Sequence, residues 1–211
     1  TNHGRLADGT FPIDGYILNY ERINQVDSIS IRDGFSSSSR YVFSNIASHY
    51  ADTPDYYYDW FKLFSIRNYD FDLSGLHDIM LVDEERRDLN TLMAMSSGYQ
   101  MRLSPLHVLS FYNAIANDGI MVKPMLYKGE TEVINPQIAS KANIDSLQLA
   151  MVKVVNEGLG KPAQSDKVQV AGVSGGCQIY TEEDNSDGKM KTEYAVEYCG
   201  YFPAENPKYS I

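Results

Sequence analysis

The chain has 211 residues, of which 43% are apolar and 22% are charged, and its formal net charge is −10. This length allows one domain with a sizeable core, and the composition is that of an ordinary globular protein. The acidic balance and the lack of a basic stripe exclude a phosphate backbone as the main partner. The sequence shows no signal peptide and no membrane-spanning run, so any targeting segment is expected outside this chain.

The first fifty residues predict a hairpin followed by a helix. The pairs Asp8-Gly9 and Asp14-Gly15 are turn signals, so we expect loop and hairpin structure over residues 1–30. A serine run, residues 36–39, then precedes apolar residues at helical spacing over residues 42–50. This order predicts a helix whose N-cap lies in or near the serine run.

Residues 52–72 are dense in aromatic side chains. Trp60, Phe61 and Phe64 lie at helical spacing within this stretch, which indicates a helix packed on the core and not a ligand cage. The following residues, 70–87, are expected to form a connecting loop.

Two further helices have clear boundaries. The first spans residues 104–117, with Ser104 as its N-cap, Pro105 at its first position and Gly119 as its stop signal. The second spans residues 145–157, where apolar residues recur on one face and glycines follow.

Two strands are predicted near the end of the chain. An apolar run enters a cluster of small residues over 170–178, and a second apolar run covers 193–202. The polar residues 181–191 between them predict a long hairpin loop joining antiparallel strands. Because glycine inside a strand indicates close approach by a ligand or another backbone, we expect something to lie along the first strand.

The two cysteines, Cys177 and Cys199, fall one on each strand of this hairpin. A cross-strand disulfide and two separate buried thiols are both compatible with this placement, depending on which way the side chains face. Two cysteines and four scattered histidines without ligand spacing do not predict a metal site.

The order of several segments resembles the penicillin-binding transpeptidases, most closely the monofunctional, division-type members. Residues 171–178 are similar to the family's Ala-Gly-Lys-Thr-Gly-Thr-Ala-Gln strand, and residues 200–203 match its Gly-Tyr-Phe-Pro strand end. The other matching segments, in family order, are residues 72–75, 98–107, 111–119, 122–124 and 157–161. Together they cover most of the chain from Gly34 onward.

The resemblance implies an α+β fold in which helices flank an antiparallel sheet and a mostly helical subdomain lies across a cleft. It implies one transpeptidase-like domain over residues 1–211, truncated at both ends, with a further strand and helix expected after Ile211 and an exposed sheet edge in their absence. The family acts on the D-alanyl-D-alanine end of peptidoglycan stem peptides, which β-lactams mimic, and needs no metal or organic cofactor. The implied location is the periplasmic or extracellular face of the bacterial cytoplasmic membrane, with an upstream anchor.

The family's first motif, Ser-x-x-Lys at the start of a buried helix, carries the nucleophile and is expected upstream of Leu6. The one literal Ser-x-x-Lys here, residues 186–189, lies in the polar hairpin loop and is interpreted as coincidence. The second motif, Ser-x-Asn, matches residues 38–40, so Ser38 stands at the relay serine and is the candidate catalytic residue. Arg40 replaces the asparagine, and a guanidinium has donors but no acceptor.

The third motif matches at β-strand residues 173–176. Val173 replaces the lysine that would hold the substrate carboxylate, so a charge-assisted hydrogen bond worth about 1.5–3 kcal/mol is missing. Ser174 keeps a hydroxyl, and the backbone N–H of Gly176 would complete an oxyanion hole. The candidate substrate-binding residues are Ser38, Arg40, Val173, Ser174, Gly175 and Gly176.

Three functional hypotheses follow. The first, which the two internal substitutions favour, is a catalytically impaired domain that binds peptidoglycan peptides or acts as a scaffold in cell-wall synthesis or division. The second is an active serine D,D-transpeptidase or carboxypeptidase whose nucleophile lies upstream. The third is a fragment without activity of its own. Acylation by penicillin distinguishes the first two.

Overall fold

The computed structural model describes residues 10–13, 16–19, 30–50, 55–69, 76–81, 88–182 and 190–211. Its helices are α1 (Ile31–Ser36), α2 (Arg40–Tyr50), α3 (Asp55–Leu63), α4 (Leu89–Ser96), α5 (Pro105–Ala116) and α6 (Lys141–Asn156), with a 3-10 turn at Lys161–Ala163. Its strands are β1 (Thr10–Ile13), β2 (Tyr16–Asn19), β3 (Met80–Leu81), β4 (Met101–Arg102), β5 (Met121–Val122), β6 (Val133–Asn135), β7 (Ala171–Glu182), β8 (Met190–Phe202) and β9 (Tyr209–Ser210).

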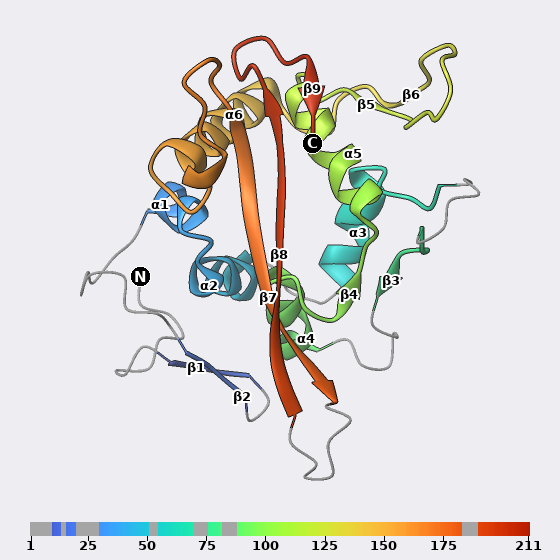
Figure 1. The fold of residues 1–211 in the computed structure, drawn as a ribbon. Helices are drawn as coiled ribbons and strands as arrows, with labels where there is room; N and C mark the ends of the chain where they lie inside the picture. The colour runs from blue at the N-terminus through green and yellow to red at the C-terminus, as the bar shows by residue number, and fades with distance from the viewer. Residues whose placement is uncertain are drawn as a thin grey trace.

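The long β7–β8 hairpin runs through the middle of the molecule, with α6 and α1 on one side and α5 on the other (Figure 1). The strands are antiparallel, and β9 adds to the outer edge of β8 through the pairs Tyr201–Ser210 and Phe202–Tyr209. The predicted hairpin is confirmed, with both strands longer than expected. In the described part of the chain, the other edge of β7 pairs with no strand, and α1 and α2 approach it.

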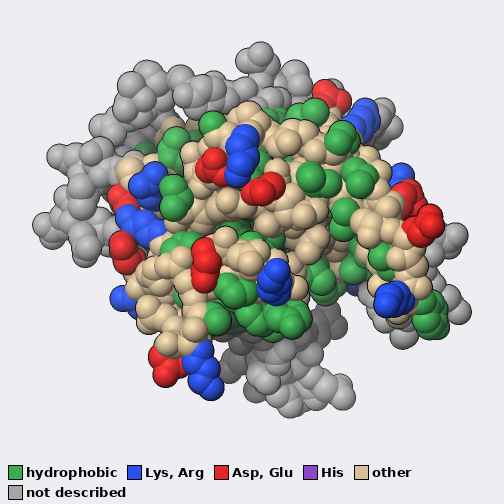
Figure 2. Space-filling model, turned by 90° about the horizontal axis from the view of Figure 1, so that it is seen from above, with side chains coloured by type: hydrophobic (Ala, Val, Ile, Leu, Met, Phe, Trp, Pro, Cys, Tyr) green, Lys and Arg blue, Asp and Glu red, His purple; other side chains and the backbone are tan. Residues whose placement is uncertain are grey.

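The main core lies where α5, α6 and the hairpin meet. Its fully buried members include Ala114, Ile115, Met121, Ile144, Met151, Ala171 and Tyr201. Ala171 of β7 and its cross-strand partner Tyr201 belong to this core, and Val173, two residues along β7, packs against it on the same face. The face of the molecule seen in Figure 2 carries interspersed basic and acidic side chains.

Several local predictions are confirmed. The hairpin before residue 30 is β1–β2, and α5 begins after Ser104 and ends before Gly119 as expected. The helix predicted over 145–157 begins earlier, at Lys141, because the Ser140 hydroxyl caps it by accepting the N–H of Asn143 at 3.3 Å.

The predicted serine cap is also present. The Ser39 hydroxyl accepts the N–H of Val42 at 3.4 Å at the start of α2. The short helix α1 before it was not predicted, and Ser30 caps it by accepting the N–H of Asp33 at 3.0 Å. The turn signal at Asp8-Gly9 lies outside the described residues.

Helix α1 is held against α6 by two contacts. The Lys153 ammonium lies 2.6 Å from the Asp33 carboxylate, and this ion pair lowers the pKa of Asp33. The backbone N–H of Leu159 donates to the Ser36 carbonyl at 3.2 Å. The turn between α1 and α2 is therefore positioned by the C-terminal end of α6.

Trp60, Phe61 and Phe64 lie on and after α3 as predicted, and they are half-buried. Trp60 and Phe64 lie 4.6 Å apart between ring centroids, and Phe64 lies 5.3 Å from Phe111 of α5. The loop expected over 70–87 contains the short strand β3, and its residues 70–75 and 82–87 lie outside the described part. Among the described helices, none is long and apolar enough to cross a bilayer.

His107 completes the N-terminal cap of α5. Its Nδ1 lies 3.0 Å from the backbone N–H of Ser104 and 2.8 Å from the Ser104 hydroxyl. Because Nδ1 accepts the backbone proton, the ring proton of the neutral form is on Nε2. The side chain is buried and stacks on Tyr69, and burial lowers the pKa of His107.

We expect His107 to make the protein less stable in mild acid. Its folded pKa lies below the unfolded value near 6.5, so the unfolded state binds more protons as the pH falls through that value. The free energy of unfolding should decrease from pH 7 to pH 5, by at most about 1.4 kcal/mol per pH unit from this residue. His107→Gln keeps a capping acceptor but does not titrate, so urea unfolding at the two pH values should differ less in that variant. Exposed His77→Gln is the control, and an unchanged pH dependence in His107→Gln would contradict the assignment.

Candidate functional site

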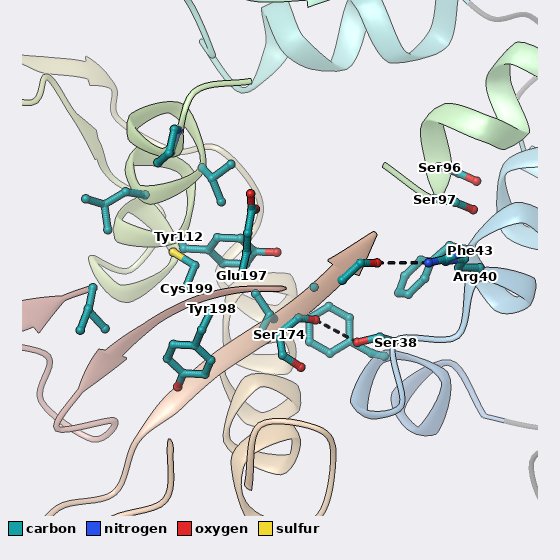
Figure 3. Close-up of a pocket in the computed structure, with 18 of the residues that line it drawn as sticks. Ser38, Arg40, Phe43, Ser96, Ser97, Tyr112, Ser174, Glu197, Tyr198 and Cys199 are labelled. Carbon is teal, nitrogen blue, oxygen red and sulfur yellow. Dashed lines mark hydrogen bonds between the residues drawn. The ribbon is translucent and has the colours of Figure 1, made fainter. Parts of the chain in front are cut away.

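A cavity of about 730 Å³ lies between the β7–β8 hairpin and helices α2, α4 and α5 (Figure 3). The structure brings together here the second- and third-motif positions, although 136 residues separate Ser38 from Ser174. All six candidate substrate-binding residues line it, namely Ser38, Arg40, Val173, Ser174, Gly175 and Gly176. The literal Ser-x-x-Lys of residues 186–189 lies outside the described residues.

Ser38 stands in the turn between α1 and α2 and contacts the strand directly. Its hydroxyl donates to the carbonyl of Ser174 at 3.0 Å (Figure 3). Its φ of +50° is in the left-handed region, which costs a non-glycine residue about 1–2 kcal/mol. The turn holds this conformation with a bond from the N–H of Ser39 to the carbonyl of Gly34, at 2.8 Å. The strained turn directs the Ser38 side chain toward β7.

Arg40, the first residue of α2, also reaches across to β7. Its Nη2 donates to the carbonyl of Gly176 at 3.1 Å, and its guanidinium carbon lies 5.3 Å from the ring centroid of Tyr99. A cation at the first turn of a helix is opposed by the helix dipole. The position of Arg40 is therefore explained by its contacts at the cavity and not by the stability of α2.

The edge of β7 that faces α2 presents polar backbone groups to the cavity. The carbonyls of Ser174 and Gly176 both point to this edge, since alternate residues of a strand direct their backbone groups to the same side. The N–H of Gly176 consequently points to the same edge. This N–H is the donor expected to complete an oxyanion hole.

The glycines of the hairpin have two different roles. A methyl group on Gly172 would collide with the hydroxyl of Tyr198, whose ring covers this glycine. The expected close approach is present at Gly172, where the Tyr198 side chain and the backbone carbonyl of Cys199 take the space. Around Gly175 a methyl group would meet no atom within 4 Å, and at Gly176 it would meet only the carbonyl of Ala195 at 3.7 Å. Among the glycines of β7, Gly175 and Gly176 are the two that leave open space beside the strand.

The charges of the cavity are few. Among the described residues that line it, Arg40 is the single basic side chain and Glu197 the single acidic one. Val173 is half-buried and packs against the main core. The hydroxyl of Ser174 is buried and makes no hydrogen bond with the described residues. An unpaired buried hydroxyl costs free energy unless a ligand or water binds it.

The register of the hairpin excludes the cross-strand disulfide. Cys199 pairs with Val173, whereas Cys177 pairs with Ala195, which lies four residues before Cys199 in β8. Four strand residues span about 13 Å, which is beyond the usual Cα separation of a disulfide. Cys199 is a free buried thiol, and burial raises its pKa to about 11. It is consequently protonated at neutral pH and a poor nucleophile.

Comparison with known proteins identifies the family to which this chain belongs. The family profile described as penicillin binding protein transpeptidase domain matches residues 3–211. The chain belongs to this family. Penicillin-binding protein 3 of Bacillus subtilis (strain 168) is 29% identical over 115 residues, which cover 51% of this chain and 17% of that protein.

Solved structures share the transpeptidase fold. The transpeptidase domain of penicillin-binding protein 3 from Burkholderia pseudomallei has a TM-score of 0.76 at 19% identity, covering 96% of this chain and 60% of that one. Penicillin-binding protein 3 of Mycobacterium tuberculosis, solved in complex with aztreonam, has a TM-score of 0.74 at 20% identity, covering 96% of this chain and 48% of that one. The chain thus spans 60% or less of these relatives. The expected α+β transpeptidase fold is confirmed.

Sequence reasoning missed the residues around the cavity that lie far from the motifs. Tyr99 lies in a segment that resembles the family, but no local pattern indicates that its ring contacts Arg40. Ser96 and Ser97 line the cavity at the C-terminal end of α4, and the Ser97 hydroxyl lies 3.0 Å from the Ser44 hydroxyl of α2. Tyr198 could have been found by its alternation on β8, because it shares a strand face with Gly200.

Proposed function

We propose that this chain is a penicillin-binding transpeptidase domain that binds the D-alanyl-D-alanine end of peptidoglycan stem peptides and does not carry out acyl transfer. The observation that carries the proposal is the chemistry of the cavity. Val173 stands at the place of the motif lysine, and the described lining residues include no lysine or histidine. In the family that lysine holds the substrate carboxylate and places a positive charge beside the reacting serine, and Arg40 replaces the asparagine that holds the substrate amide.

The groups that remain suit binding. The hydroxyls of Ser38 and Ser174 and the backbone edge at Gly176 can all form hydrogen bonds with a peptide. The Mycobacterium tuberculosis relative was solved with aztreonam, a β-lactam, on the same kind of fold. This supports the proposal that stem peptides, and β-lactams as their mimics, occupy the cavity here.

The same proposal assigns the protein to a cell-wall synthesis or division complex, in which a non-catalytic domain serves as a scaffold. It places the domain on the periplasmic or extracellular face of the cytoplasmic membrane. The support for this location and for these partners is membership of the family.

The test is intact-mass spectrometry of the full-length gene product after incubation with benzylpenicillin. We expect the mass to remain that of the unmodified protein, because Val173 and Arg40 replace the lysine and the asparagine that hold the ligand at the nucleophile in the family. A transpeptidase with all three motifs, treated in parallel, should gain the mass of one penicillin. Circular dichroism of the same sample confirms that the protein is folded.

A covalent adduct on the full-length protein would overturn the non-catalytic proposal. It would instead support an active serine D,D-transpeptidase or carboxypeptidase with its nucleophile upstream of this chain. Peptide mapping of the adduct would then identify the acylated serine.

A further inference from the structure

Among the described residues that line the cavity, the single cation is Arg40, which stands on α2 and not on the strand. In the family motif the positive charge comes from a lysine on the strand, at the place of Val173 in this chain. Here the guanidinium of Arg40 reaches the same strand from the opposite wall and bonds the Gly176 carbonyl at 3.1 Å. The cavity therefore contains a positive charge, but Arg40 supplies it and not the residue at the position of the family's strand lysine.

The guanidinium of Arg40 has N–H donors available to a ligand. It carries five N–H donors in a planar fork, and the described residues account for the Gly176 carbonyl as acceptor. No described carboxylate forms an ion pair with Arg40, and the nearest acidic lining residue, Glu197, belongs to β8. The contacts with Gly176 and Tyr99 fix the plane of the fork while leaving further donors available.

The surroundings of Arg40 favour an anion. The N-terminal end of α2, an 11-residue helix, adds a partial positive charge at this point. The buried hydroxyl of Ser174 is unpaired among the described residues and lines the same cavity. Next to them, the bare backbone at Gly175 leaves open space. A carboxylate can accept two parallel hydrogen bonds from a guanidinium fork.

We propose that Arg40 binds the terminal carboxylate of the ligand and takes the place of the strand lysine, with the Ser174 hydroxyl as a second donor. The proposal rests on the proposed function, because it requires a carboxylate-bearing peptide or β-lactam in the cavity. Arg40 then determines specificity: ligands with a free carboxylate bind, and the corresponding amides bind poorly.

The probes that test this are a stem pentapeptide ending in D-alanyl-D-alanine and the same peptide with a C-terminal amide. Isothermal titration calorimetry with the full-length protein should give a Kd about 10- to 100-fold lower for the acid than for the amide. Arg40→Gln should weaken binding of the acid by about the same factor and abolish the preference. Arg40→Lys keeps the positive charge but not the planar fork, so this variant should retain part of the preference for the acid.

Arg102→Gln is the matched control, because Arg102 is an exposed arginine on β4 that does not line the cavity. It should bind both peptides as the parent does. If Arg40→Gln, folded by its thermal unfolding curve, still prefers the acid, the assignment of Arg40 is overturned while the proposed function stands. If the parent binds neither peptide, the proposed function and this inference both fail.

Discussion

The double variant Val173→Lys/Arg40→Asn is expected to bind benzylpenicillin about five- to thirtyfold more tightly than the parent protein. The change moves the cation from α2 back to β7 and releases the Gly176 carbonyl that Arg40 now occupies. It also introduces an amide that can both donate to and accept from the ligand. Two additional neutral hydrogen bonds contribute about 1–2 kcal/mol, which corresponds to this change in Kd.

Each single substitution is expected to do less. Arg40→Asn removes the cation without replacing it, and Val173→Lys adds a second cation while the Gly176 carbonyl stays occupied. The coupling free energy from the double-mutant cycle should therefore favour the pair. Isothermal titration calorimetry at one fixed ionic strength measures the Kd for benzylpenicillin of the parent, the two single variants and the double variant. Thermal unfolding of the same proteins shows how much stability is lost when a lysine replaces the half-buried Val173.

The pair Val133→Lys/Arg102→Asn is the control, since it makes the same chemical changes at exposed positions outside the cavity. It should bind as the parent does. A Val173→Lys/Arg40→Asn protein that is folded but binds penicillin no better than the parent would show that the motif alignment is wrong.

Local signals were enough to predict the elements that hold the cavity. The β7–β8 hairpin follows from two apolar runs around a polar segment, and α5 follows from Ser104, Pro105 and Gly119. Helix α1 was missed because it is only six residues long and contains Gly34. That glycine is explained by tertiary packing, since a methyl group there would lie 2.6 Å from the side chain of Val42. No local pattern contains this information.

The cavity itself was predictable only as far as the motifs reach. Their order placed Ser38, Val173 and Gly176 in one site, and the structure brings them together. The bond between Arg40 and Gly176 joins residues 136 positions apart and depends on how α2 docks. The space beside Gly172 depends on the ring of Tyr198 in another strand. Such contacts follow from packing and register, which sequence periodicity does not specify.

Gly158→Ala is expected to destabilise the protein by about 2–3 kcal/mol and to weaken ligand binding as well. A methyl group on Gly158 would collide with the carbonyl oxygen of Ser36 and lie 2.9 Å from that of Val154. Both obstacles are backbone atoms, which cannot rotate away as a side chain can, so the cost reaches the upper range for overpacking. Relief requires α1 to move away from α6, and the bond from Leu159 to Ser36 would be lost with it.

The loss of binding follows because Ser36 is two residues before Ser38 and four before Arg40. Chemical denaturation and stem-peptide titration measure the two effects on the same sample. Gly129→Ala is the control: its methyl group would come no closer than 3.9 Å to any atom, so stability should stay within about 0.5 kcal/mol of the parent. If Gly158→Ala lost stability but bound the peptide normally, the α1–α6 contact would be structural alone and α2 would hold its place at β7 by its own contacts.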